Sequence, residues 1–192
     1  RSIHFEYLKP VFEKYGYHLV ILKNESRSVV DTGLKYVNND ACYPSIIAVG
    51  QMMEAVLSGQ YDVNRLALII TQTGGCCRAS NYVAFSRRAL EKAGLTQIPV
   101  ISLNFNGMER NEGFRPSLPM LRDAGKVLVL GDLLMKCMYR VRPYEMTPGS
   151  ADALHEKWKK IITDSVSGKE KRGFAEMCRE LVQDFDMLPI HE

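Results

Sequence analysis

Apolar and polar positions along the first hundred residues alternate between two patterns. Three short runs have the length and the apolar character of buried strands: residues 17–22, 66–71 and 98–103. Stretches with apolar residues at helical spacing separate or flank them: residues 5–15, 44–57 and 80–94. Strands that alternate with helices predict right-handed crossovers and a parallel sheet. We therefore expect an α/β fold, a three-layer parallel sheet of few strands with flanking helices and a C-terminal helical extension.

The pattern changes after Asn104. Residues 106–116 are rich in glycine and charge and predict a loop, as do the polar residues that follow the first strand. Residues 118–139 predict one long helix interrupted by Gly125 and Gly131, although residues 127–130 alone also fit a strand. Two more helices are predicted at residues 151–165 and 170–185. We expect an α/β domain over residues 1–146 and C-terminal helices over residues 147–192 that pack on it.

Composition narrows the class of protein. A net charge of +3 with 24% charged residues argues against a nucleic-acid-binding tail and against disorder. The sequence has no charge-free apolar run of about 18 residues and no visible signal peptide, so we expect no membrane association. Five cysteines, an odd number with one adjacent pair, fit a reducing cytoplasm better than a secreted disulfide framework. Because the sequence begins with Arg1, we expect it to come from a longer or processed gene product.

The strongest candidate for chemistry is the turn Thr73-Gly74-Gly75-Cys76-Cys77-Arg78 between the second strand and the next helix. Gly74 and Gly75 allow positive φ and a close approach of the backbone to a ligand. The helix that follows, which Ser80 can cap, directs free N–H groups toward the turn and favours an anion. That anion is either a phosphate or the thiolate of Cys77, whose pKa Arg78 would lower further.

The turn is expected to meet two other polar segments, because ligands of open α/β sheets bind beyond the carboxyl ends of the strands. One segment runs from Asn38 to Pro44 and contains Cys42, just ahead of a helix, and the other is Asn104-Phe105-Asn106. The sequence has neither a Gly-x-x-x-x-Gly-Lys loop nor a Cys-x-x-Cys pair. Three interpretations therefore stay open: a metal or cluster site, a phosphate-binding turn, and a structural turn with inert cysteines.

A polar cluster of Arg140, Arg142, Tyr144 and Glu145 at the end of the long helix is a lesser candidate. It is either a helix stop with cations near the C-terminal dipole or an anion clamp, for instance on the phosphates of coenzyme A.

Four segments together resemble the C-terminal region of the large acyl-CoA dehydratase activase-related proteins, which belong to the 2-hydroxyacyl-CoA dehydratase/activator superfamily. The segments are Lys35-Tyr36-Val37-Asn38-Asn39-Asp40-Ala41-Cys42-Tyr43-Pro44, Thr71-Gln72-Thr73-Gly74-Gly75-Cys76-Cys77-Arg78-Ala79-Ser80-Asn81-Tyr82, Gly131-Asp132-Leu133-Leu134 and Arg142-Pro143-Tyr144-Glu145. The resemblance covers roughly residues 5–145, and its most specific part is the segment that follows Cys76.

The resemblance implies a dehydratase-like domain with an iron–sulfur cluster, of the 4Fe-4S type, for electron transfer linked to acyl-CoA dehydration. It implies Cys42 and Cys77 as metal ligands, whereas Cys76 stands where the relatives have a third glycine and Cys137 where they have an apolar residue. Residues expected to contact the cofactor or a substrate phosphate are Gly74, Gly75, Arg78, Ser80 and Asn81. Two thiolates do not hold a four-iron cluster, so Cys76, Cys137, a missing segment or a partner chain must supply the others.

The resemblance also implies partners: other domains of a larger activase-type chain or dehydratase subunits, and a CoA-type ligand. The relatives carry ATP-binding modules upstream, and none is recognisable in this sequence, so we expect no ATPase activity of it. They also begin with a strand ahead of Ile3, whose loss would leave the sheet with an open edge. The alternative function is a non-catalytic nucleotide- or CoA-binding module, or an interaction module of a larger protein.

Overall fold

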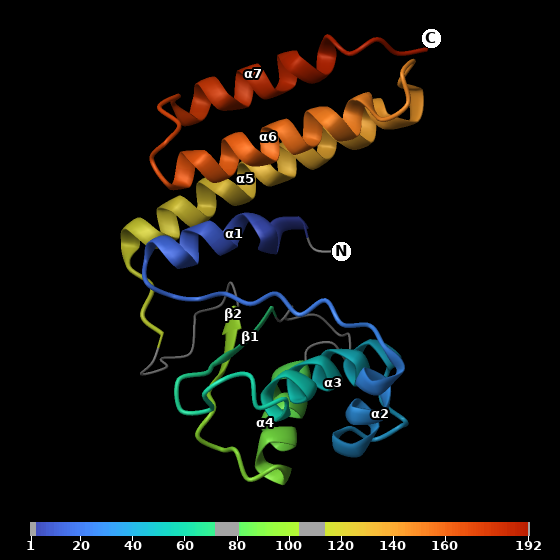
Figure 1. The fold of residues 1–192 in the computed structure, drawn as a ribbon, viewed down its shortest axis with the longest axis vertical. Coiled ribbons are helices and arrows are strands. Elements are labelled where there is room, and N and C mark those ends of the chain that lie inside the picture. Colours follow the sequence, from blue (N-terminus) through green and yellow to red (C-terminus); the bar gives the residue numbers. More distant parts are fainter. Residues whose placement is uncertain (1–2, 72–80, 104–113, 192) are drawn as a thin grey trace. The chain divides into compact units, whose positions relative to one another are not determined.

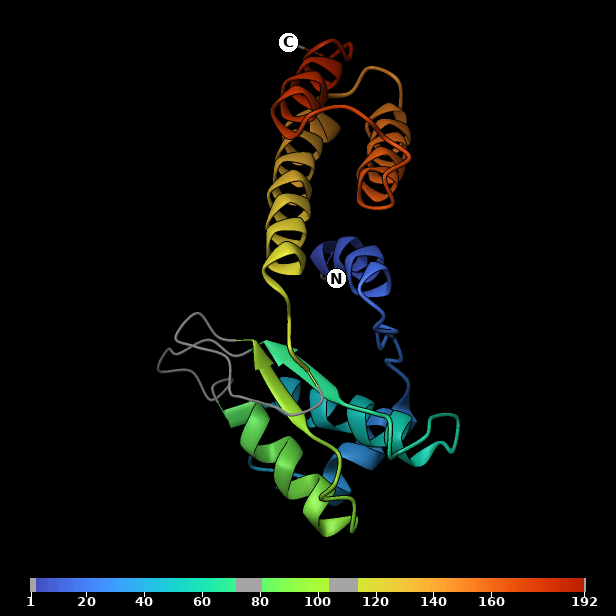
Figure 2. The same cartoon turned by 90° about the vertical axis from the view of Figure 1, so that its left-hand side faces the viewer.

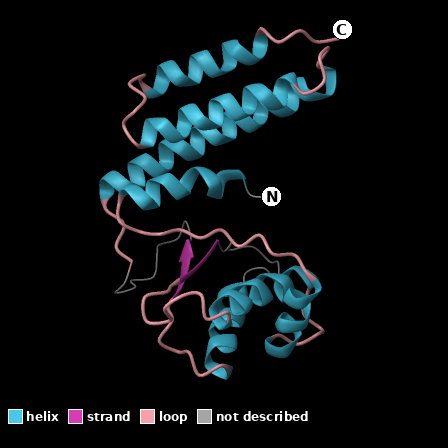
Figure 3. Cartoon of the chain, in the orientation of Figure 1, coloured by secondary structure: helices cyan, strands magenta, loops and turns pink. Residues whose placement is uncertain are grey.

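The computed structural model describes residues 3–71, 81–103 and 114–191, and helices dominate it (Figures 1 and 3). The elements, in chain order, are α1 (Ile3–Lys14), α2 (Arg27–Tyr36), α3 (Tyr43–Leu57), β1 (Leu68–Thr71), α4 (Tyr82–Lys92), β2 (Val100–Leu103), α5 (Leu118–Val141), the 3₁₀ helix η2 (Arg142–Tyr144), α6 (Ser150–Val166) and α7 (Phe174–Asp186).

The predicted three-layer α/β fold is wrong. Helices make up 62% of the described residues and strands 6%, and the sheet that these residues form has two strands, β1 and β2, which pair in parallel. The apolar run at residues 17–22 is extended but belongs to no strand, and Val20 in it is 40% exposed. An apolar run specifies a strand only where a second strand is available for its backbone hydrogen bonds, and periodicity does not detect the partner.

Helix α2 lies where the sequence predicts a polar loop. Of its residues only Val29 and Gly33 are buried, one turn apart on the face toward α3. An apolar stripe this narrow, which contains a glycine, is hard to recognise as a helix from the sequence. The other helical predictions are confirmed within a few residues: α5 continues through Gly125 and Gly131 to Val141, so the alternative strand at residues 127–130 does not form.

The chain forms two compact units, and the first combines Arg1–Ile21 with Pro116–Glu192. Within it α5 packs against α1, α6 and α7, and Figure 1 shows the helices of this unit. Ser117 caps α5 by accepting a hydrogen bond from the backbone N–H of Met120 at 3.3 Å. The largest fully buried side chains of the unit include Tyr7, Trp158 and Phe185.

The second unit, Leu22–Arg115, contains both strands and α2, α3 and α4. Helices α2 and α3 approach so closely that a Cβ atom on Gly33 would lie 2.2 Å from the carbonyl oxygen of Ile46. A Cβ atom on Gly50 would lie 2.1 Å from the carbonyl oxygen of Val29. The two glycines therefore permit a backbone-to-backbone contact that no other residue would allow.

One apolar core joins the elements of the second unit. Its buried members come from α3, α4, both strands, the residue after α2 and the segment before β2: Val37, Ile46, Val49, Met52, Met53, Val56, Leu68, Val83, Ala89, Leu90, Ile98 and Val100. Helix α4 connects β1 to β2, which gives the β-α-β crossover that the sequence predicts for this stretch. The two strands run in the same direction (Figure 2), as such a crossover requires.

Candidate functional site

The carboxyl ends of β1 and β2 lie side by side. Thr71 and Leu103, the last residues of the two strands, are register partners in the parallel pair. These two strand ends therefore mark one edge of the sheet, the edge at which open α/β sheets bind ligands. The predicted site residues Gly74, Gly75, Cys76, Cys77, Arg78 and Ser80, and the segment from Asn104 to Asn106, lie outside the described residues.

Cys42 is the N-cap residue of α3, as the sequence predicts, and Pro44 occupies the first turn of that helix. Its thiol is half-buried and donates to the hydroxyl of Ser45, with 3.5 Å between Sγ and Oγ. The Ser45 hydroxyl in turn donates to the carbonyl oxygen of Cys42 at 2.7 Å. Because Ser45 is fully buried, this pair of hydrogen bonds fixes the thiol against the start of the helix.

The position of Cys42 suits a thiolate. The first backbone N–H groups of a helix and the helix dipole stabilise negative charge at this end. If the thiol ionises, the Ser45 hydroxyl can rotate and donate to the sulfur instead of accepting from it. Sequence reasoning missed Ser45, although a serine three residues after a predicted N-terminal cysteine is the available signal.

Asn81 is the last of the predicted site residues, and it forms the N-cap of α4. It is exposed, and its side chain makes no capping hydrogen bond to α4. Helix α4 ends at Lys92, and Gly94 then takes a φ of +71°, the left-handed conformation that commonly terminates a helix.

Ser102 is a further candidate that sequence reasoning missed. It faces Ile70 across the parallel pair, one residue before the end of β2, and is only 4% exposed. Its hydroxyl has no hydrogen-bond partner among the described residues. Leaving such a buried group unsatisfied costs about 1–3 kcal/mol of stability. A hydrogen bond from the Ser102 hydroxyl to a ligand or to another part of the chain would remove this cost. A lone serine at the carboxyl end of an apolar strand is the signal that could have found it.

The part of the chain that the structure describes contains no complete metal-binding site. No three His, Cys, Asp or Glu side chains there lie close enough together to hold one. Burial raises the pKa of the Cys137 thiol on α5 and that of the Cys178 thiol on α7, which disfavours the thiolate that a metal requires. Of the thiols described, Cys42 alone lies at the start of a helix, and Cys76 and Cys77 lie outside the described residues.

The cluster at the end of α5 has a structural role. The Glu145 carboxylate accepts hydrogen bonds from the backbone N–H groups of Gly149 and Ala151, each at 2.8 Å, and so caps α6. These bonds lower the pKa of Glu145. Arg142 lies 3.2 Å from the carboxylate of Asp152. Since Glu145 caps a helix, Arg142 pairs with Asp152 and Arg140 lies 3.9 Å from Asp186, the cluster needs no bound anion to explain it.

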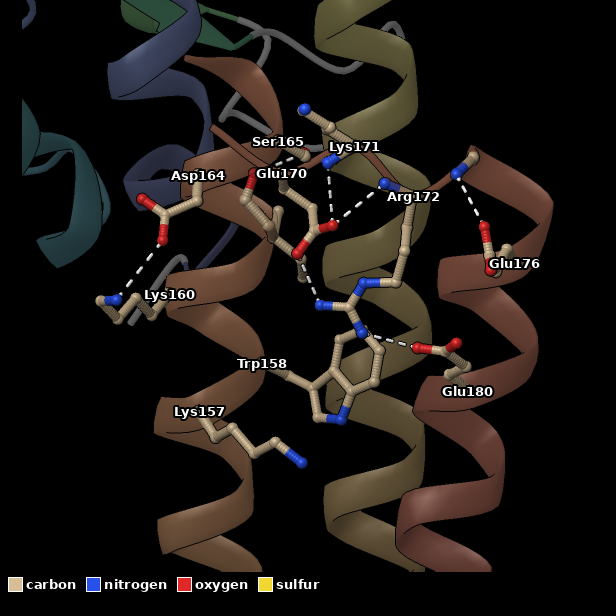
Figure 4. A network of polar contacts seen from close by, with 12 residues as sticks. Lys157, Trp158, Lys160, Asp164, Ser165, Glu170, Lys171, Arg172, Glu176 and Glu180 are labelled. Atoms are coloured by element: carbon tan, nitrogen blue, oxygen red, sulfur yellow. Dashed lines mark hydrogen bonds and ion pairs between the residues drawn. The ribbon is translucent and has the colours of Figure 1, made fainter. Parts of the chain in front are cut away.

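A second polar network links α6, α7 and the segment that connects them (Figure 4). The Arg172 guanidinium lies over the Trp158 ring, 5.6 Å from its centroid, and contacts Glu170 and Glu180 at 2.6 Å each. The hydrogen bond from the Arg172 side chain, followed by that from its backbone N–H, lowers the pKa of Glu170 to about 2. The Trp158 indole N–H donates to Asp184 at 2.9 Å, so every polar group of the network has a protein partner.

Comparison with known proteins identifies no relative, since neither a family model nor a curated protein nor a solved structure matches the chain. Among the helices that the structure describes, none combines the length and apolar composition needed to cross a bilayer.

Proposed function

We propose that the chain contributes a dehydratase-activase-related domain that binds an iron–sulfur cluster for electron transfer linked to acyl-CoA dehydration. The observation that carries the proposal is the parallel pairing of Thr71 with Leu103. Thr71 and Leu103, the last described residues before the segment with Cys76 and Cys77 and before the segment after β2, are therefore neighbours in the sheet. The resemblance of residues 35–44 and 71–82, which contain Cys42, Cys76 and Cys77, to the activase-related proteins supplies the identity of the cofactor.

Cys42 supports the proposal through its local chemistry. A thiolate at the start of α3 would be stabilised by the helix and by the buried Ser45 hydroxyl, 3.5 Å from the sulfur. Hydrogen bonds to the ligand sulfurs are one means by which proteins set the reduction potential of a cluster. Cys42, Cys76 and Cys77 supply three thiolates, and a four-iron cluster would take its fourth ligand from another domain or a dehydratase subunit. The odd number of cysteines leads us to place the domain in the cytoplasm.

Anaerobic reconstitution with iron and sulfide tests the proposal. The protein should retain iron and sulfide after desalting and show thiolate-to-iron charge-transfer absorbance. Cys42→Ser and Cys77→Ser should lose both signals. Cys178→Ser is the matched control, because that thiol lies on α7 in the other unit, and it should bind as the unchanged protein does. Absence of bound iron in the folded protein, or equal iron binding in the Cys42 and Cys178 variants, would overturn the proposal.

A non-catalytic nucleotide- or CoA-binding module is the second candidate, and the Ser102 hydroxyl favours it. A phosphate oxygen at the edge of the sheet would accept the hydrogen bond that this buried group lacks among the described residues. Coenzyme A binding measured by calorimetry separates the candidates. Ser102→Ala and Arg78→Ala should weaken binding while Cys42→Ser leaves it unchanged, and the reverse pattern would refute this candidate.

A further inference from the structure

We propose that the second unit has a separate binding site for a small organic anion, an apolar group that bears a phosphate or carboxylate. The site is an open surface hollow of about 510 Å³. Its lining combines two cations, two amides and two aliphatic side chains: Lys35, Lys92, Asn38, Asn39, Leu34 and Val37.

The charge of the hollow favours an anion. Lys35 lies in the last turn of α2 and Lys92 in the last turn of α4, so two helices end beside it. Each helix C-terminus carries roughly half a negative charge, which two ammonium groups more than offset, leaving roughly one positive charge. Among the described residues that line the hollow none is a carboxylate, so no lining side chain neutralises this excess.

The amide of Asn38 is oriented to donate. Its Oδ1 atom accepts a hydrogen bond from the backbone N–H of Asp40 at 3.3 Å, which completes a local turn. With the oxygen engaged, the NH₂ group of Asn38 is the part of the amide left for a ligand, and it can only donate. Donors of this kind, next to two ammonium groups, recognise phosphate or carboxylate oxygens.

The aliphatic residues indicate that the ligand is more than an inorganic ion. Val37 is 5% exposed, whereas Leu34 is 44% exposed and has apolar surface to cover. A ligand with an apolar body would bury that surface while its anionic end meets the lysines. Binding sites for small molecules commonly combine an apolar wall with a few polar groups that fix the orientation of the ligand.

This inference does not depend on the proposed cluster, because none of the lining residues is a cysteine and the test uses the protein without iron. The probes are phenyl phosphate, inorganic phosphate and phenol, each titrated into the protein at low salt and followed by calorimetry or NMR. Phenyl phosphate should bind in the millimolar range and more tightly than either fragment. Its affinity should fall as salt is added, because the lysines are exposed.

Lysine variants locate the binding. Lys35→Gln and Lys92→Gln should each weaken phenyl phosphate binding about threefold, and the double variant about tenfold, as expected for exposed charge pairs. Lys136→Gln on α5, an equally exposed lysine of the other unit, should change nothing. Three results would each overturn the site: no binding, equal weakening by the Lys136 variant, and equal affinity for inorganic phosphate and phenyl phosphate.

Discussion

Replacement of Gly50 by alanine should destabilise the second unit strongly. The new methyl carbon would lie 2.1 Å from the carbonyl oxygen of Val29 and 3.1 Å from the backbone nitrogen of Gly33. Both neighbours are backbone atoms, so no side-chain rotation relieves the overlap, and α2 must move away from α3 by about 1 Å to restore van der Waals contact. That movement loosens a contact in which Val29, Val49 and Met53 are fully buried.

The magnitude follows from two opposing effects. Overpacking a close-packed site costs about 1–3 kcal/mol of stability. Because the atoms around the new methyl group at Gly50 are backbone atoms that cannot rotate away, we expect a cost at the upper end of this range. Alanine is better than glycine in a helix by about 1 kcal/mol, which offsets part of this. We therefore expect the free energy of unfolding of the second unit to fall by about 2 kcal/mol.

Urea unfolding followed by far-UV circular dichroism measures the change, provided that the transitions of the two units are fitted separately. Gly125→Ala is the matched control, since Gly125 lies in the interior of helix α5 with no atom within 4 Å of the new methyl group. The Gly125→Ala variant should raise the free energy of unfolding of the first unit by about 0.5–1 kcal/mol. If Gly50→Ala also gained stability, the close approach of α2 and α3 would be refuted.

Three other predictions concern the first unit. Because Arg172 depresses the pKa of Glu170 to about 2 from an ordinary 4.5, the stabilisation from their pairing is present above pH 4.5 and lost as the pH falls toward 2. Glu170→Gln should therefore flatten the acid dependence of the melting temperature over that range, and an unchanged profile would contradict the network. Burial is the main cause that raises the pKa values of Cys137 and Cys178. Both thiols should therefore react slowly with iodoacetamide at neutral pH in the native protein and rapidly in urea. Rapid reaction of either thiol in the native protein would contradict this burial. Glu145→Gln should lower the melting temperature by weakening the cap of α6, and Glu145→Asp, too short to reach both N–H groups, should lower it as well; no change in either variant would rule out the cap.

The sequence predicts most helices and one crossover correctly, because these depend on local signals. Pro44 marks the start of α3, Gly94 follows the end of α4, and the apolar runs that contain β1 and β2 are flanked by helical periodicity. The layered sheet was an extrapolation from local patterns, and it fails at residues 17–22, where the described chain offers the apolar run no strand partner.

The candidate site was predictable only where local sequence signals determine it. The position of Cys42 at a helix start follows from the adjacent Pro44. The burial of Ser45 and Ser102 depends on how distant segments pack, which periodicity does not contain. The hollow beside Lys35 and Lys92 likewise forms from the ends of two helices that are far apart in the chain.

The first unit is discontinuous, because Leu22–Arg115 is inserted between its first helix and its remaining helices. During synthesis on a ribosome, α1 is made before α5 and α6, the helices that pack on it, and lacks them until the whole inserted unit has been made. The inserted unit has its own core and can fold in the meantime. Once folded, this compact unit no longer behaves as a long flexible chain between α1 and α5, which reduces the entropy lost when they meet. A variant that unfolds the inserted unit, such as Gly50→Ala at elevated temperature, would therefore also delay assembly of the helices of the first unit.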